Sequence, residues 1–196
     1  MLKMRIRPVF FSCVVIISTF QLSAADHGRH HDEDHHNQRQ HKSHMHGVSE
    51  LNIVSENNTI EMELISPSAN FLGFEHRPKS EAQQAKLDQL IKQLNLAQQL
   101  FEFSGSANCD VRQTNIESEL LQSDAGHGHK RHDEESHSGF HVEYKAICKN
   151  RQDLTDIKVN LFSYFPGMET INVQLITENA QRSMVLKPDS ANIAFR

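Results

Sequence analysis

Residues Leu51–Leu64 read LNIVSENNTIEMEL, and this stretch predicts a β-hairpin. Apolar side chains alternate with polar ones on both sides of Asn57-Asn58, a pair of residues typical of a turn. Alternation with a period of two indicates strands with one buried face and one wet face. We expect the ordered domain to begin near Gly47 and the hairpin to end at Pro67.

One helix is expected over Ser80–Gln99. Ser80 and Gln83 form the pattern of a capping box after Pro78. Apolar residues follow at helical spacing, and we interpret them as the face that packs on a sheet. These residues are Leu87, Leu90, Ile91, Leu94 and Ala97.

The remaining patterned segments predict strands. The expected fold class is therefore α+β, a mostly antiparallel β-sheet with one main helix. Residues 47–196 are enough to bury a core and are expected to form one domain. The predicted strands are Cys109–Leu121, Phe140–Cys148, Asp156–Phe162, Thr170–Thr177, Ala180–Leu186 and Ile193–Phe195.

The N-terminus predicts export. Residues 1–25 combine a basic start, an apolar run over Pro8–Leu22 and small residues at Ser23–Ala25, which together are typical of a secretory signal peptide. We expect cleavage after Ala25, with an uncleaved anchor as the alternative. No other apolar run is long enough to cross a bilayer, so the mature chain is expected to be soluble in the periplasm.

The charge balance argues against nucleic acid as a partner. The chain has 20 basic and 25 acidic residues, a formal net charge of −5, and loss of the basic signal makes it more acidic. Nucleic-acid binding needs a basic footprint, whereas an acidic surface attracts cations. Metal ions are therefore the expected partners.

Two histidine-rich segments carry most of the 14 histidines. Residues 26–46 are of low complexity and are expected to be disordered, and residues 122–139 are expected to form a histidine-rich loop. Neutral imidazole is a common zinc ligand and also suits copper and nickel, so both segments predict metal binding. The first segment holds His27, His30, His31, His35, His36, His41, His44 and His46, and the loop with its flank holds His127, His129, His132, His137 and His141.

His76 stands apart from both segments, in a stretch that precedes the expected helix. Two interpretations are open. It is either a histidine hydrogen-bonded within a loop or a metal ligand of a tighter site on the folded domain. For the second interpretation, the sequence suggests His46 as a companion, because His46 lies at the edge of the first strand.

Three other interpretations fit the histidines less well. They can belong to a solvated linker, or to a pH sensor, because imidazoles titrate near pH ~6.5. His127-x-His129-x-x-His132 is close to the signature of metallo-β-lactamase-like hydrolases, but Arg131 stands where an acidic ligand is needed. Catalysis also needs a rigid scaffold, which a polar loop does not provide. The protein is therefore expected not to be an enzyme.

Cys109 and Cys148 are the two cysteines left after signal cleavage. In an oxidising compartment such a pair predicts a disulfide, with thiolate metal ligands as the alternative. If the strands that hold them pair antiparallel, the cysteines meet near one end and the histidine-rich loop lies at the other.

Four blocks of sequence are distinctive: His44–Gly47 (HMHG), Ser66–Asn70 (SPSAN), Gly73–His76 (GFEH) and Leu161–Pro166 (LFSYFP). With the histidine runs, they resemble the ZrgA-like family of proteobacterial periplasmic zinc-binding proteins. The resemblance extends over essentially the whole mature chain. It implies a zinc-regulated protein that assists zinc acquisition beside an ABC-type importer.

The sequence thus predicts an exported protein, not an enzyme, that captures Zn²⁺ through histidine-rich segments for zinc acquisition. One alternative is a periplasmic buffer that detoxifies copper or nickel, since both metals also bind imidazole. Another is an interaction module, whose function would survive removal of both histidine-rich segments.

Overall fold

The structure is a computed structural model that describes residues 45–122 and 138–195. All of these residues belong to one compact unit. The predicted signal peptide and most of both predicted histidine-rich segments lie outside the described residues, so the predictions for them stay predictions. Of the histidines, His46, His76 and His141 are described.

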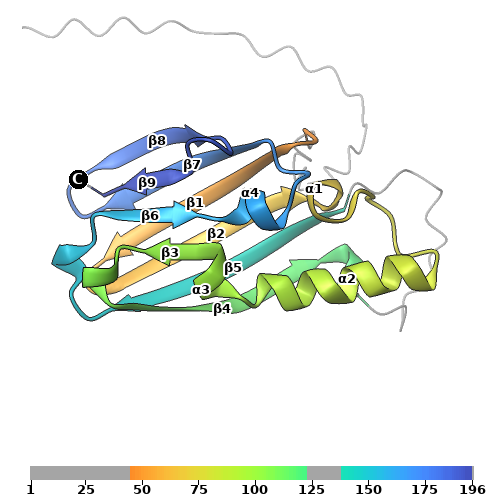
Figure 1. Cartoon of the computed structure of the whole chain (residues 1–196), viewed down its shortest axis with the longest axis horizontal. Coiled ribbons are helices and arrows are strands. Elements are labelled where there is room, and N and C mark those ends of the chain that lie inside the picture. Colours follow the sequence, from red (N-terminus) through yellow and green to blue (C-terminus); the bar gives the residue numbers. More distant parts are fainter. Residues whose placement is uncertain (1–44, 123–137, 196) are drawn as a thin grey trace, which may run out of the picture. The chain divides into compact units, whose positions relative to one another are not determined.

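The predicted hairpin is confirmed and lies in the middle of a six-stranded sheet. Its strands are β1 (Val48–Glu56) and β2 (Thr59–Pro67), and they pair antiparallel. Asn57 adopts a left-handed backbone conformation (φ 52°) in the turn between them, which asparagine tolerates better than most residues. The strand order across the sheet is β4-β5-β2-β1-β7-β8 (Figure 1).

Four more strands extend the sheet on both sides of the hairpin. On one side lie β5 (Gly139–Cys148) and β4 (Cys109–Ser118), both antiparallel to their neighbours. On the other side, β7 (Thr170–Thr177) pairs with β1 in parallel and β8 (Gln181–Leu186) follows antiparallel. The described sheet is therefore mostly antiparallel, as expected, and the β1–β7 pair departs from that rule.

A second layer covers one face of this sheet (Figure 1). It contains α2 (Glu81–Leu94) and a small sheet of β3 (Phe101–Phe103), β6 (Asp156–Val159) and β9 (Asn192–Ala194). Tyr144 of β5 joins the layers, because its ring contacts Phe101 and its hydroxyl donates to the Leu94 carbonyl. Burial raises the pKa of the Tyr144 hydroxyl, which stays neutral. The domain is thus α+β with its core between two layers.

The remaining short elements are single helical turns between the longer ones. They are α1 (Ser68–Leu72), α3 (Ala97–Leu100), α4 (Leu161–Tyr164) and the 3₁₀ turns η1 (Gly105–Ala107), η2 (Glu119–Leu121) and η3 (Arg151–Asp153).

The helix begins where the sequence predicts and ends earlier. The Ser80 side chain accepts from the Gln83 amide, and the Gln83 side chain accepts from the Lys79 amide, which confirms the cap. The expected end at Gln99 was wrong, because α2 stops at Leu94. The Asn95 side chain bonds to the Ile91 carbonyl there, and α3 then forms a separate turn.

Two predicted strands were too long. The strand expected over Asp156–Phe162 ends at Val159, because Asn160 donates to carbonyls at the end of the α3 region and the chain then turns into α4. The strand expected over Cys109–Leu121 ends at Ser118, whose hydroxyl accepts from the Leu120 amide and caps η2.

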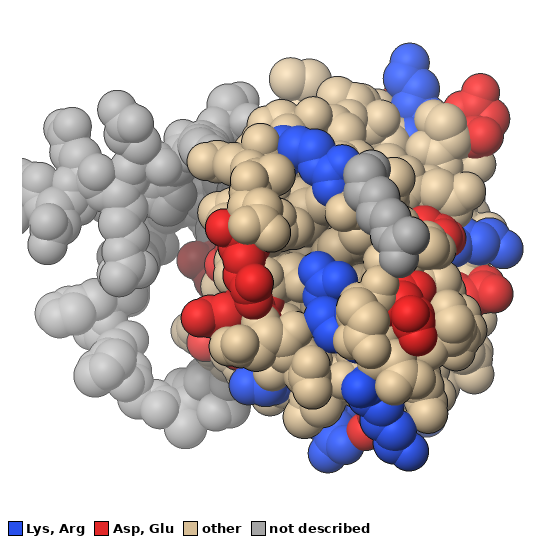
Figure 2. All heavy atoms as spheres, turned by 90° about the vertical axis from the view of Figure 1, so that its left-hand side faces the viewer, with Lys and Arg blue, Asp and Glu red and all other residues tan. Residues whose placement is uncertain are grey.

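The predicted disulfide is present between Cys109 and Cys148, with an S–S distance of 2.06 Å. The two residues are direct partners in the β4–β5 register. At the other end of the same two strands, Ser118 is opposite Phe140. The histidine-rich loop therefore leaves the domain at the end away from the disulfide. Figure 2 faces the disulfide end and shows acidic and basic side chains intermixed on it.

Replacing both cysteines by serine should lower the free energy of unfolding by about 3–4 kcal/mol, since the bond closes a long loop in the unfolded chain. Urea unfolding followed by circular dichroism measures this difference. Reduction of the natural protein should give a similar loss and serves as the control. Equal midpoints for oxidised and reduced protein would contradict the prediction.

Candidate metal site

Both histidine-rich segments join the domain at the same end of the six-stranded sheet. Met45 and His46 lead directly into β1, and the loop returns at Ser138 into β5. β2 ends here too, and its last residue, Pro67, pairs with Gly139. The Ser68 amide donates to the Ser138 carbonyl at 3.0 Å, which joins α1 to the end of the loop. Both predicted histidine-rich segments are therefore attached to the described domain at this end of the sheet.

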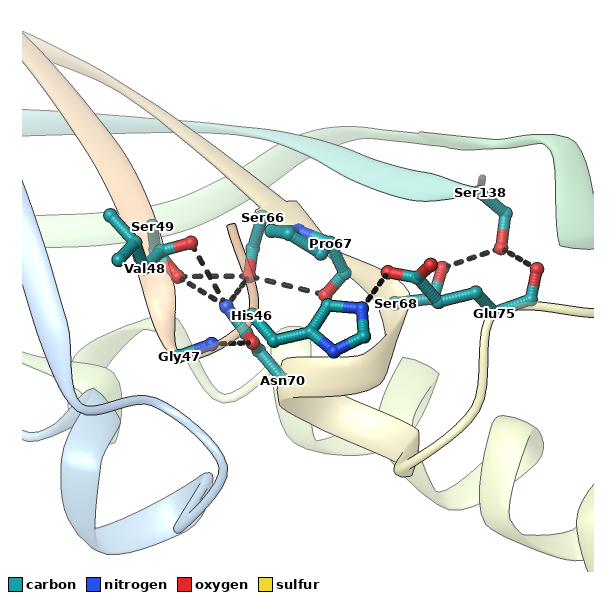
Figure 3. A network of polar contacts seen from close by, with 10 residues as sticks. All are labelled: His46, Gly47, Val48, Ser49, Ser66, Pro67, Ser68, Asn70, Glu75 and Ser138. Atoms are coloured by element: carbon teal, nitrogen blue, oxygen red, sulfur yellow. Dashed lines mark hydrogen bonds and ion pairs between the residues drawn. The ribbon is translucent and has the colours of Figure 1, made fainter. Parts of the chain in front are cut away.

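Asn70 of α1 fixes the chain where it enters β1 (Figure 3). Its Oδ1 accepts from the Gly47 amide at 2.7 Å, and its Nδ2 donates to the Val48 carbonyl at 3.0 Å. The same Nδ2 is 3.2 Å from Ser49 Oγ and 3.1 Å from Ser66 Oγ. Asn70 is buried, so these bonds replace those that water would make. The backbone that follows His46 is held in one conformation as a result.

Ser138 performs a similar task at the end of the loop (Figure 3). Its hydroxyl donates to the Glu75 carbonyl at 2.7 Å and lies 2.9 Å from Ser68 Oγ. Because a hydroxyl has one hydrogen, Ser68 must be the donor in that second bond. Ser138 thereby fixes the backbone of Glu75 against α1.

A pocket of about 700 Å³ opens beside these two networks. Its lining includes His46, Glu75, His76, Lys79 and Glu169. His46 Nε2 lies 3.2 Å from Glu75 Oε1, and the two side chains point toward one another in Figure 3. The His46 side chain is 67% exposed and that of Glu75 is 15% exposed, so an exposed imidazole faces a mostly buried carboxylate.

Two glycines bring the pocket walls close together. Gly47 has a φ of 81°, and a Cβ there would lie 3.1 Å from the Glu169 carboxyl carbon. A Cβ on Gly167 would lie 2.5 Å from the Asn70 carbonyl oxygen. Neither position can take a side chain without movement of the backbone or of Glu169.

The ring of His76 is oriented by its neighbours. Nδ1 lies 2.8 Å from the Arg77 carbonyl, and the ring stacks on Phe74 with centroids 5.1 Å apart. A carbonyl only accepts, so Nδ1 carries the hydrogen, and in the neutral ring Nε2 holds the lone pair. Metal-binding histidines are commonly oriented in this way.

His141 lies elsewhere, on the face of β5 that points away from the core. Its Nε2 is 2.6 Å from Glu63 Oε1 of β2, and the two side chains are 35% and 39% exposed. His141 is not among the residues that line the pocket. Of the three described histidines, the structure therefore brings His46 and His76 to one pocket and leaves His141 apart.

Within residues 45–122 and 138–195, no three histidine, cysteine or acidic side chains already converge as a metal site. The other predicted ligands lie outside the described residues. Glu75 and Glu169 were not among the predicted ligands. Glu75 directly precedes His76 in the sequence, and this neighbourhood could have marked it as a candidate ligand. Glu169 is brought to the pocket by the β1–β7 pairing, which the sequence pattern did not indicate.

Comparison with known families identifies the class of protein. A family described as "ZrgA family zinc uptake protein" matches residues 43–195, so the chain belongs to that family and the resemblance seen in the sequence is confirmed. The matched region contains the pocket and the whole histidine-rich loop. A comparison with curated proteins gave no match. None of the helices in the described part of the chain is long and apolar enough to cross a membrane.

Replacing Asn70 by alanine should lower the free energy of unfolding by about 2–4 kcal/mol, because the Gly47 amide loses its acceptor and the Val48 carbonyl and the Ser49 and Ser66 hydroxyls each lose one bond. Urea unfolding measures the effect. Asn172→Ala, on the exposed face of β7, is the control and should change stability by less than about 0.5 kcal/mol. Equal effects of the two substitutions would contradict the role given to Asn70.

Proposed function

We propose that this protein captures Zn²⁺ in the periplasm through its histidine-rich segments and assists zinc acquisition, in partnership with an ABC-type importer. Membership of a zinc uptake family supports the role in zinc acquisition. The observation that carries capture by the segments is the placement of both segment attachments at one end of the sheet, next to a pocket lined by two histidines and two glutamates.

The chemistry follows from imidazole. At neutral pH most imidazoles are unprotonated and bind Zn²⁺, whereas below about pH 6 protons compete with the metal. Eleven histidines lie in residues 26–44 and 123–137. Many ligands tethered to one domain give a high local concentration, so an ion released by one imidazole is readily bound by another.

In this proposal the folded domain is a scaffold for zinc capture, and the protein is not an enzyme. The disulfide and the Asn70 network hold the strands from which both segments start. A metal buffer for copper or nickel is the competing function, and the experiments below distinguish it.

Calorimetric titration of residues 26–196 with Zn²⁺ at pH 7.4 should show several ions bound per chain. A variant of the same length, in which the eleven histidines of 26–44 and 123–137 are glutamine, should bind one ion at most. Circular dichroism checks that the variant is folded. Equal stoichiometry for the two proteins would refute capture by the histidine-rich segments.

Deletion of the gene should slow growth when zinc is chelated from the medium, and added Zn²⁺ should restore growth. The natural gene should complement the deletion, and the variant with glutamine at the eleven histidines should do so only weakly. If the deletion strain grows normally when zinc is chelated but poorly in excess copper or nickel, the protein is instead a detoxifying buffer.

A further inference from the structure

We propose that the pocket binds one zinc ion of its own, with His46, Glu75 and His76 as the protein ligands. The inference rests on the proposed function for the identity of the ion, but it concerns a defined site on the folded domain rather than the histidine-rich segments. Glu75 is the ligand that the histidine pattern of the sequence does not indicate.

The first argument is the spacing of His46 and Glu75. Zinc binds histidine nitrogen and carboxylate oxygen at about 2.0–2.2 Å, so two such ligands at a tetrahedral angle are about 3.4 Å apart. His46 Nε2 and Glu75 Oε1 are 3.2 Å apart. A zinc ion can therefore replace the contact between these atoms with almost no movement of either side chain, provided that His46 carries its hydrogen on Nδ1.

The second argument is the state of His76. The bond from its Nδ1 to the Arg77 carbonyl leaves Nε2 as the basic nitrogen, and His76 lines the same pocket as the His46–Glu75 pair. No three ligating groups within the described ranges meet in the geometry observed, so the His76 ring must turn toward the pair to complete the site. The side chain is exposed, and the rotation gives up the stack on Phe74 and the bond from Nδ1 to the Arg77 carbonyl, two contacts that the bond to zinc must replace.

The third argument is electrostatic. The pocket lining contains two carboxylates, Glu75 and Glu169, and one ammonium group, Lys79. A divalent cation bound here would be near more negative than positive charge. The Glu75 carboxylate is also mostly buried, which strengthens its attraction for a cation relative to an exposed carboxylate.

The backbone around the ligands is already fixed. Ser138 holds the Glu75 carbonyl, and Asn70 holds the Gly47 amide and the Val48 carbonyl next to His46. The backbone of Glu75 and the backbone next to His46 therefore lose little freedom when the metal binds. A zinc ion with three protein ligands keeps a fourth position for water, which permits exchange of the ion.

The His141–Glu63 pair provides a matched control. It is also a histidine in contact with a glutamate, at 2.6 Å, but it lies on the outer face of the sheet and outside the pocket lining. If contact between histidine and carboxylate were enough to bind zinc, Glu63 and Glu75 would be equivalent. Under the proposal, only Glu75 contributes to zinc affinity.

The test uses residues 26–196 carrying glutamine at the eleven histidines of 26–44 and 123–137. Zinc calorimetry at pH 7.4 should show one ion per chain, and nitrogen NMR of the histidine rings should show the metal on Nε2 of His46 and His76. Glu75→Gln and His76→Asn should each weaken binding by at least about 10-fold. Glu63→Gln should leave the dissociation constant within about 3-fold, since it touches no proposed ligand. Thermal unfolding without zinc checks that all variants are folded.

Each outcome decides a different statement. If the natural chain binds several ions and the variant with glutamine at the eleven histidines binds none, capture by the segments stands and the pocket site is overturned. A single ion whose affinity is unchanged by Glu75→Gln also overturns it. If neither protein binds zinc, the proposed function fails together with the site.

Discussion

The hydrogen bonds of one buried amide determine how this end of the molecule is built. Asn70 contacts the chain on both sides of the start of β1 and the hydroxyl of Ser66 at the end of β2. It also lies against Gly167, which brings the segment before β7 close to α1. The hairpin, the segment before the parallel strand and the pocket wall thereby meet at a single residue. Without it, the backbone next to His46 would lose the bonds at Gly47 and Val48 that hold it, and the position of His46 relative to Glu75 would be less restricted.

Much of the fold was predictable because the deciding signals are local. Alternation of apolar and polar residues indicated β1, β2, β5 and β7, and their burial follows that pattern. The cap of α2 was encoded within four residues. The errors have non-local causes. Asn160 leaves its strand because it bonds to carbonyls around α3, and β7 lies parallel to β1 because of packing between distant segments. A pattern within ten residues contains no information about such partners.

The candidate site was predictable only in part, for a related reason. Histidine density identifies a chemistry without a geometry, so the sequence set only His76 apart and suggested His46 as its companion. The structure separates the three that it describes: His46 and His76 line a pocket, while His141 is in contact with Glu63 on an open sheet face. Glu75 gains its position from Ser138, which is 63 residues away in sequence. Such a contact depends on the β2–β5 register, which could be derived only after the fold was known.

The disulfide has a consequence for metal selectivity. β5 is ten residues long, which places Cys148 about 30 Å along the strand from Gly139 and the pocket end. Soft ions such as Cu(I) prefer thiolate, whereas Zn²⁺ also accepts imidazole and carboxylate. Once Cys109 and Cys148 are joined, the ordered domain has no thiolate to offer among its described residues. Oxidation of this pair therefore does more than stabilise the sheet, because it removes the two cysteine thiolates as ligands for soft ions.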